Sequence, residues 1–293
     1  MNYSQTYQLY LELVEKELEK CLPVVESYPG LLHQAMHYSV MGGGKRIRPV
    51  LVLAAAETVG GHGLEIAPAA CALELIHTYS LIHDDLPAMD DDDFRRGRPS
   101  NHKVYGEAMA ILAGDALLSQ AFFLLANLNV SKPHSRLRVI SEIACASGSL
   151  GMVGGQVADT CPDGEMTPDA ALDYIHRHKT GALLRVCVRT GAILAGAAEG
   201  AVERLSEYGD NLGLLFQIVD DILDVEGDAD KLGKPTGSDE KKGRLTYPLL
   251  YGLAESKQKA AQTAERAVAS LSLFGAEADF LRQLIQQMTV RDH

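Results

Sequence analysis

The sequence contains no tryptophan and few aromatic residues of any kind, and its cysteines are few and scattered. The five cysteines, Cys21, Cys71, Cys145, Cys161 and Cys187, form no CxxC pair, so neither a zinc site nor a disulfide scaffold is predicted. Reduced thiols in a cytoplasmic protein are the expected state. Basic residues are also scarce, and the net charge of −12 argues against general nucleic-acid binding, which needs a broad basic surface.

Long uncharged apolar segments are missing as well. No run of about 18 apolar residues free of charge occurs, so a membrane span is not predicted. The first residues lead into a charged stretch instead of the apolar core of a signal peptide. What remains is a composition with 46% apolar and 23% charged residues, typical of a soluble globular protein with a sizeable core.

Apolar residues recur at helical spacing along nearly the whole chain. Tyr10, Val14, Leu18 and Cys21 follow the spacing i, i+4, i+8, i+11. The same pattern covers the ranges 31–41, 49–60, 69–85, 105–128, 138–158, 169–196, 201–225, 256–272 and 277–289. Sustained alternation with period two is missing, so no sheet is predicted. Residues 1–293 are therefore expected to form a single all-α domain.

Two aspartate-rich motifs lie within this apolar helical sequence. The first motif runs from His83 to Asp90 and the second from Val219 to Asp224. Each pair of neighbouring carboxylates costs about 3 kcal/mol at about 5 Å and an effective dielectric of about 20. A solvated helix end would explain one such motif. Two of them, each followed by basic residues, favour binding of Mg²⁺, which usually holds substrate phosphates as well.

The second motif places its carboxylates on one helical face. Asp220, Asp221 and Asp224 lie at roughly 0°, 100° and 40° around an ideal helix. Gln217, three residues earlier, shares this face. The spacing therefore predicts a joint metal-binding surface at this point of the chain.

The first motif is less regular. Asp84 and Asp90 are separated by about 240° on an ideal helix, and Pro87 removes a backbone donor between them. The helix must bulge or end for these two to converge. Asp91 would share the face of Asp84 on an uninterrupted helix, so spacing alone leaves Asp90 and Asp91 as alternatives. His77, seven residues before Asp84, lies on the same helical stripe and is a further candidate for the functional site.

Basic residues are gathered close to glycines or to the first motif. The segment Gly42–Pro49 places flexible backbone amides beside Lys45 and Arg48, although it lacks the spacing of a Walker P-loop. Arg95 and Arg96 follow the first motif directly. The sequence shows no Ser/His/Asp or Cys/His arrangement. The two acidic motifs and the separate basic clusters instead predict two diphosphates as ligands, at least one of them bound through metals.

Six segments together resemble the trans-prenyltransferases (polyprenyl diphosphate synthases), most of all the bacterial farnesyl diphosphate synthases. They are GGGKRIRP, HTYSLIHDDLPAMDDDDFRRGRPSNH, GMVGGQ, HRHKTGALL, FQIVDDILD and LGKPTGSD, in this order from about residue 41 to about residue 248. The resemblance implies an isoprenoid synthase fold, a helical bundle around a central cavity, and a homodimer. It also implies that both motifs share one pocket.

The resemblance further implies a role for each matching position. Three Mg²⁺ would be bound by Asp84, Asp85, Asp90, Asp220, Asp221 and Asp224. The allylic diphosphate would be contacted by Arg95, Lys179, Gln217 and Lys234. Isopentenyl diphosphate would be held by Gly44, Lys45, Arg48, His77 and Arg96. Thr180 and Gln217 would face the carbocation formed when the allylic C–O bond ionises, and Asp159 would order the neighbouring helix.

The length of the product depends on residues just before the first motif. Tyr79, Ser80 and the two-residue insertion in DDLPAMD resemble the bacterial farnesyl diphosphate synthases. An ordinary packed aromatic remains an alternative for Tyr79, since an ideal helix places it about 140° from Asp84. One departure concerns Arg244, which precedes Thr246 where the family often has lysine. Residues 227–246, rich in glycine and lysine, are a candidate lid.

The predicted function is Mg²⁺-dependent condensation of isopentenyl diphosphate with dimethylallyl and geranyl diphosphates to give farnesyl diphosphate. A geranylgeranyl diphosphate synthase is the first alternative. A class I terpene cyclase is disfavoured by the basic residues suited to a second diphosphate, Lys45, Arg48 and Arg96, and by the DDILD form of the second motif. A non-catalytic synthase subunit is disfavoured because both aspartate motifs are intact.

Overall fold

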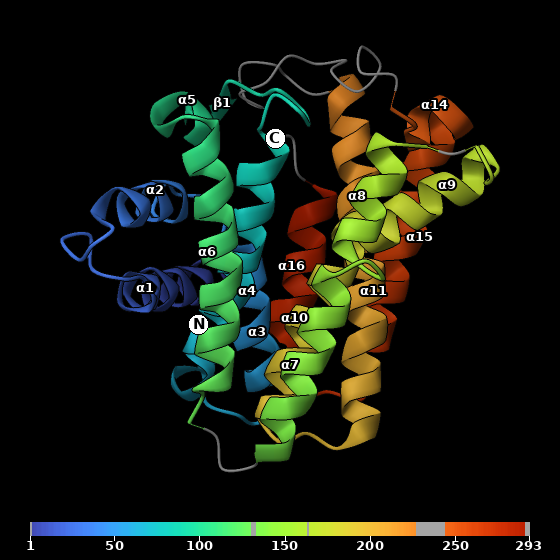
Figure 1. Ribbon diagram of the computed structural model, residues 1–293. Coiled ribbons are helices and arrows are strands. Elements are labelled where there is room, and N and C mark those ends of the chain that lie inside the picture. Colours follow the sequence, from blue (N-terminus) through green and yellow to red (C-terminus); the bar gives the residue numbers. More distant parts are fainter. Residues whose placement is uncertain (1, 130–132, 163, 227–243, 291–293) are drawn as a thin grey trace. The chain divides into compact units, whose positions relative to one another are not determined.

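The computed structural model describes residues 2–129, 133–162, 164–226 and 244–290, which are mostly helical (Figure 1). Contacts group the chain into two compact units. Unit 1 comprises Met1–Leu53 and His62–Ile140, and unit 2 comprises Ala54–Gly61 and Ser141–His293. The predicted all-α class is confirmed, whereas the single domain over residues 1–293 stays a prediction.

The helices of unit 1 are α1 (Tyr3–Cys21), α2 (Gly30–Val40), α4 (Gly63–Asp84), α5 (Asn101–Tyr105) and α6 (Glu107–Ala126). Residues of α3 (Ile47–Thr58) and α7 (Pro133–Ser147) belong partly to each unit. The helices of unit 2 are α8 (Met152–Thr160), α9 (Pro168–Ile175), the π-helix η1 (His176–Gly181), α10 (Ala182–Leu194), α11 (Glu199–Glu226), α14 (Tyr247–Tyr251), α15 (Leu253–Ser270), the 3₁₀-helix η2 (Ala276–Ala278) and α16 (Asp279–Thr289).

Helix α4 forms the core of unit 1, where it packs against α6 and α1 (Figure 1). Its central turns are buried on all sides, as expected for a core helix with apolar residues around its whole circumference. Helix α1 buries Tyr10, Val14, Leu18 and Cys21, so the stripe predicted from spacing is confirmed. The fold thus anchors α4 firmly and leaves its C-terminal end to carry the first motif.

Helix α6 is long and apolar enough to cross a membrane by length and composition. It nevertheless carries Asp115 in its middle, and it buries Ala113, Leu117 and Leu125 within the protein. Figure 1 shows it alongside α4. These features describe a core helix with one exposed face, so its composition alone does not identify a membrane span.

A short hairpin follows the first motif, although no sheet was predicted from the sequence. Phe94–Arg95 (β1) pairs antiparallel with Arg98–Pro99 (β2). Arg96 and Gly97, between the strands, have positive φ of 54° and 73°. Positive φ at both central residues is the geometry that fits the twist of a two-residue hairpin. Strands this short have no periodicity that sequence patterns could detect.

Glycines allow the π-helix η1 to pack against its neighbours in unit 2. A Cβ on Gly155 of α8 would lie 2.1 Å from the backbone nitrogen of Lys179, and one on Gly213 of α11 would lie 2.6 Å from Cα of Gly181. Any side chain at these positions would push η1 away. The helical pattern over 169–196 therefore contains a π-helical turn, a feature common at functional sites.

His176 begins η1 and is almost fully buried, with its ring stacked on that of Tyr247 at a centroid distance of 5.4 Å. Burial disfavours the imidazolium and lowers the pKa of His176 to about 4. The ring is therefore neutral at physiological pH.

The depressed pKa of His176 predicts a loss of stability in acid. The unfolded chain takes up a proton near pH 6.5 that the folded protein accepts only near pH 4, so the free energy of unfolding falls as the pH drops through this window. At pH 5 this residue accounts for a loss of about 2 kcal/mol. His176→Gln should therefore lose less stability than the wild type between pH 7 and pH 5, measured by urea unfolding. Equal losses in both proteins would contradict the prediction.

Candidate functional site

The first motif in unit 1 lies where α4 ends. The helix stops at Asp84, and the following turn doubles back so that the amide of Asp90 donates to the carbonyl of Asp84 at 2.8 Å. Asp91, with φ of 52°, donates from its amide to the carbonyl of Leu86. The helix therefore ends instead of bulging, and the backbone of Asp90 returns to that of Asp84. This geometry supports Asp90 over Asp91 as the partner of Asp84.

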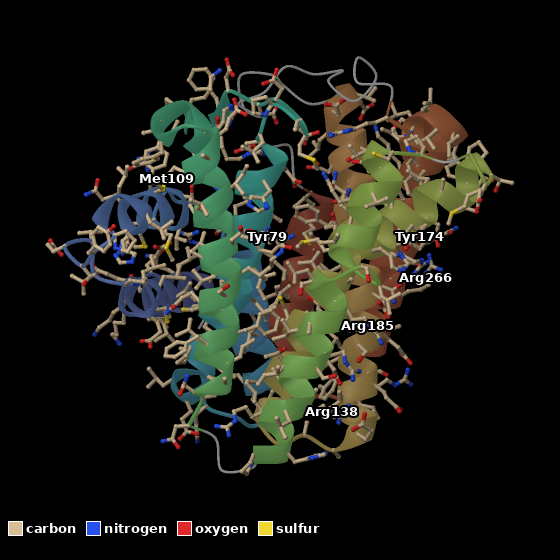
Figure 2. The ribbon with its side chains drawn as sticks, viewed as in Figure 1. Tyr79, Met109, Arg138, Tyr174, Arg185 and Arg266 are labelled. Atoms are coloured by element: carbon tan, nitrogen blue, oxygen red, sulfur yellow. The ribbon has the colours of Figure 1, made fainter. Side chains whose placement is uncertain are left out.

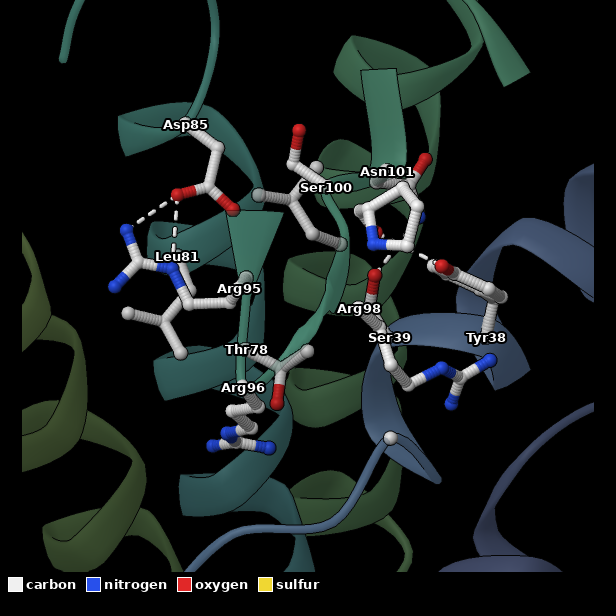
Figure 3. Close-up of a pocket in the computed structure, with 13 residues that line it drawn as sticks. Tyr38, Ser39, Thr78, Leu81, Asp85, Arg95, Arg96, Arg98, Ser100 and Asn101 are labelled. Carbon is white, nitrogen blue, oxygen red and sulfur yellow. Dashed lines mark hydrogen bonds and ion pairs between the residues drawn. The ribbon is translucent and has the colours of Figure 1, made fainter. Parts of the chain in front are cut away.

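Asp85 is the most deeply buried carboxylate of the first motif. It is 2% exposed, and its Oδ1 accepts hydrogen bonds from Nε of Arg95 at 2.9 Å and from Nη2 of the same residue (Figure 3). Burial raises the pKa of Asp85, and the hydrogen bond to Arg95 opposes the rise without cancelling it. Arg95 also pairs with Asp92 at 3.2 Å. The hairpin thus supplies the positive charge that the crowded motif requires.

A cluster of four arginines, Arg46, Arg48, Arg95 and Arg96, surrounds the predicted candidate His77 in unit 1 and is here termed the cation cluster. Burial lowers the pKa of His77 well below its usual value, and each of these arginines lowers it further. His77 is therefore uncharged, and the region around it attracts anions. The structure thus brings together Arg48, His77 and Arg96, which were all predicted to bind isopentenyl diphosphate.

The other two residues predicted for that ligand, Gly44 and Lys45, lie on the loop before α3. Gly44 has φ of 126°, and the carbonyl of Lys45 accepts a hydrogen bond from the hydroxyl of Tyr7. Arg96 donates to the carbonyl of Gly43, so this loop and the hairpin are joined. A pocket between them is lined by Thr78, Asp85, Arg95, Arg96 and residues of α2 (Figure 3).

Two buried charged residues in this region were not singled out from the sequence. Arg46 is 2% exposed and Glu74 is 1% exposed, and they form an ion pair with a distance of 2.8 Å. A signal did exist, because Glu74 is the only acidic residue in the apolar range 66–82. An isolated carboxylate within a buried helix requires a partner of opposite charge.

The predicted chain-length residues lie one turn before the end of α4. The ring of Tyr79, which is labelled in Figure 2, is 8% exposed. It stands edge-on to that of His83, with centroids 5.6 Å apart. His83 in turn packs so closely on α6 that a Cβ on Gly114 would lie 2.2 Å from its Nε2. The hydroxyl of Ser80 donates to the carbonyl of His77. Tyr79 is thus held in one place by the packing of α4 on α6.

The second motif occupies the C-terminal part of α11 in unit 2. Asp221 and Asp224 are buried and Asp220 is half-buried. Oδ2 of Asp221 accepts a hydrogen bond from the amide of Tyr247 at 2.9 Å and lies 3.6 Å from Nε2 of His176. Sequence reasoning missed both neighbours, since a backbone amide leaves no signature in side-chain spacing.

Lys179 of η1 is paired with Asp159 of α8, with 2.5 Å between Nζ and Oδ2. Nε of Arg244 lies 3.8 Å from the same oxygen, so the arginine that departs from the family pattern contacts the residue predicted to order this helix. Thr180 and Gln217 are half-buried on η1 and α11. Lys234 and most of the candidate lid over 227–246 lie outside the described residues.

Carboxylate oxygens are the ligands that Mg²⁺ prefers, so both motifs fit this ion chemically. In unit 1 the amide of Asp90 bonds to the carbonyl of Asp84, and in unit 2 the amide of Tyr247 fixes one oxygen of Asp221. Among the described residues, Asp91, Asp93 and His102 also bring possible ligand atoms within 4.8 Å of one another. Which carboxylates hold metal ions stays a prediction.

Comparisons with known proteins agree with these features. The sequence profile of the polyprenyl synthetase family matches residues 29–285. The chain is 47% identical to the farnesyl diphosphate synthase of Geobacillus stearothermophilus over 96% of this chain and 95% of that protein. It is 46% identical to the geranylgeranyl diphosphate synthase of Cyanophora paradoxa over 91% of this chain and 89% of that protein.

The fold has a close counterpart among solved structures. The crystal structure of an FPP/GFPP synthase from Zymomonas mobilis superimposes with a TM-score of 0.88 at 37% identity, covering 98% of this chain and 99% of that one. The resemblance inferred from the sequence motifs is confirmed, as is the isoprenoid synthase fold. The chain belongs to the polyprenyl synthetase family of prenyltransferases.

Proposed function

We propose that this prenyltransferase joins isopentenyl diphosphate to dimethylallyl diphosphate and then to geranyl diphosphate, with farnesyl diphosphate as product. The observation that carries the proposal is the pairing, within unit 1, of two kinds of anion-binding chemistry. Carboxylates suited to Mg²⁺ end α4, and the cation cluster lies around His77 beside them. A protein that elongates a prenyl chain needs both, because it binds one diphosphate to be ionised and one that stays intact.

The metal ions would be held by Asp84, Asp85, Asp90, Asp220, Asp221 and Asp224, and three Mg²⁺ are proposed. When bound, Mg²⁺ neutralises the allylic diphosphate and makes it a better leaving group. Oδ1 of Asp85 accepts both hydrogen bonds from Arg95, so a metal ion bound at that oxygen would displace the guanidinium.

The other predicted residues bind and orient the substrates. Arg95, Lys179, Gln217 and Lys234 would contact the allylic diphosphate, and Lys179 would exchange Asp159 for this ligand. Thr180 and Gln217 would present oxygen atoms to the allylic carbocation. The double bond of isopentenyl diphosphate attacks that cation, and the departed diphosphate accepts the proton lost from the product.

A farnesyl product is favoured by Tyr79, which is held rigidly below the first motif by His83 and α6. A geranylgeranyl product is the second candidate, since relatives of that name match nearly as well. A homodimer is proposed, and exposed apolar residues of α6 are candidates for its contact, since Ile111, Leu112 and Phe123 are 44%, 54% and 61% exposed. A cytoplasmic location stays a prediction.

The central experiment is incubation of the purified protein with isopentenyl and dimethylallyl diphosphates and Mg²⁺. Farnesyl diphosphate should accumulate, and chelation of the metal should stop the reaction. Asp84→Ala and Asp220→Ala should each lower kcat by at least about 10³-fold, since each removes a ligand of the ions that stabilise the leaving group. Near-normal turnover in either variant would refute the metal roles. Turnover of geranyl diphosphate without isopentenyl diphosphate would favour a cyclase.

Replacement of Tyr79 tests the proposed limit on chain length. Tyr79→Ala removes a buried aromatic ring, so the main product should change from farnesyl to geranylgeranyl diphosphate, as measured by chromatography of the products. Tyr28→Ala serves as control because that tyrosine is 97% exposed. An unchanged product distribution in Tyr79→Ala would show that another residue limits the chain.

The exposed apolar residues of α6, Ile111, Leu112 and Phe123, predict where two copies of the chain meet. Phe123→Glu places a charge in an apolar contact, and the molar mass measured by light scattering should fall from that of a dimer to that of a monomer. Leu64→Glu, on an exposed residue of α4, should leave the mass unchanged. A dimer that persists in Phe123→Glu would place the contact elsewhere.

A further inference from the structure

Glu74 is a buried carboxylate that belongs to none of the predicted ligand sets. It lies on α4 one turn before His77 and is 1% exposed. Its Oε1 accepts a hydrogen bond from Nη1 of Arg46 at 2.8 Å and lies 3.9 Å from Nη2 of Arg96. One oxygen atom thus interacts with two members of the cation cluster, one from the loop before α3 and one from the hairpin.

Arg46 transmits this contact to the loop that carries Lys45 and to the first turn of α3, which carries Arg48. Its backbone has φ of 48°, which is uncommon for a residue with a side chain. Its guanidinium also donates to the carbonyl of Val40 at 2.6 Å and to Oε1 of Glu15 at 2.7 Å. A buried guanidinium that is bonded at several points fixes the backbone turn at Arg46. It thereby fixes the directions in which the side chains of Lys45 and Arg48 leave the backbone.

Arg96 is held in the same way from the other side. It has φ of 54° and donates to the carbonyl of Gly43. Its guanidinium packs so closely on Gly44 that a Cβ there would lie 2.6 Å from Cζ of Arg96. Loop and hairpin therefore interlock at Gly44, and Glu74 supplies the negative charge beneath this junction.

The charges around Glu74 explain why a carboxylate is needed at this position. Burial lowers the pKa of Arg96, the charge of Glu74 raises it, and the other arginines of the cation cluster lower it again. Positive groups gathered to attract a diphosphate repel one another while no diphosphate is bound. A buried carboxylate on the inner side offsets this repulsion and leaves the outer side available to an anion.

We propose that Glu74 is a positioning residue for isopentenyl diphosphate, because its carboxylate orients Arg46 and Arg96 and thereby presents Lys45, Arg48 and Arg96 to the diphosphate. The proposal rests on the function proposed above and adds a residue that does not itself touch the substrate. Its effect is specific to one of the two substrates, since the allylic diphosphate is assigned to other residues.

The test is steady-state kinetics of Glu74→Gln, which keeps the shape of the side chain and removes its charge. The KM for isopentenyl diphosphate should rise about 10-fold or more, because small displacements of binding groups are costly. The KM for geranyl diphosphate and kcat should change by less than about threefold. Glu65→Gln is the matched control, because it removes the charge of an exposed carboxylate in the first turn of the same helix. Its KM values should change by less than about threefold.

A second variant covers the case in which Glu74→Gln does not fold. Glu74→Gln combined with Arg46→Met removes both charges of the buried pair, which is far less destabilising than removal of one. Its KM for isopentenyl diphosphate should be raised to a similar extent. An unchanged KM for isopentenyl diphosphate in a folded variant, or equal rises for both substrates, would overturn the proposal. If the wild type does not consume isopentenyl diphosphate at all, the proposed function fails instead.

Discussion

Repulsion between like charges is the constraint on which the arrangement of this protein depends. Binding two diphosphates requires carboxylates to gather metal ions and guanidinium groups to grip phosphate oxygens, and each set is unfavourable in the absence of its ligand. The fold meets this constraint locally. Arg95 folds back onto Asp85, Glu74 lies beneath Arg46, and Lys179 pairs with Asp159. In these three pairs each charge thus has a partner of opposite sign.

Small structural irregularities place these charges. The hairpin between Phe94 and Pro99 turns through residues with positive φ, and it directs Arg95 to the end of α4 and Arg96 to the loop before α3. The π-helix η1 approaches α8 and α11 only because glycines face it, and it carries Lys179 and Thr180. In both units the long regular helices form the core. They carry some of the groups proposed to bind substrate, such as His77 on α4 and Asp220 on α11, and the departures from regularity carry others, such as Arg95 and Lys179.

The long helices could be predicted, and the candidate site residues could be named, because both rest on local patterns. The stripe Tyr10–Cys21 follows directly from helical periodicity, and motif spacing was sufficient to identify both aspartate motifs. The remaining features depend on contacts between distant parts of the chain. The preference for Asp90 over Asp91 rests on a turn that closes onto Asp84, and the Arg46–Glu74 pair joins a loop to a helix. No pattern within a short window contains this information.

The most direct test of the account is a crystal structure of the protein with Mg²⁺ and an unreactive analogue of the allylic diphosphate. The account predicts metal ions bonded to carboxylates of both motifs, Asp84 at the end of α4, Asp90 from the turn that follows and Asp220 from α11, with the diphosphate oxygens completing their coordination. Lys179 would then contact the diphosphate. Metal ions absent from either motif, or a diphosphate bound away from these aspartates, would contradict the account.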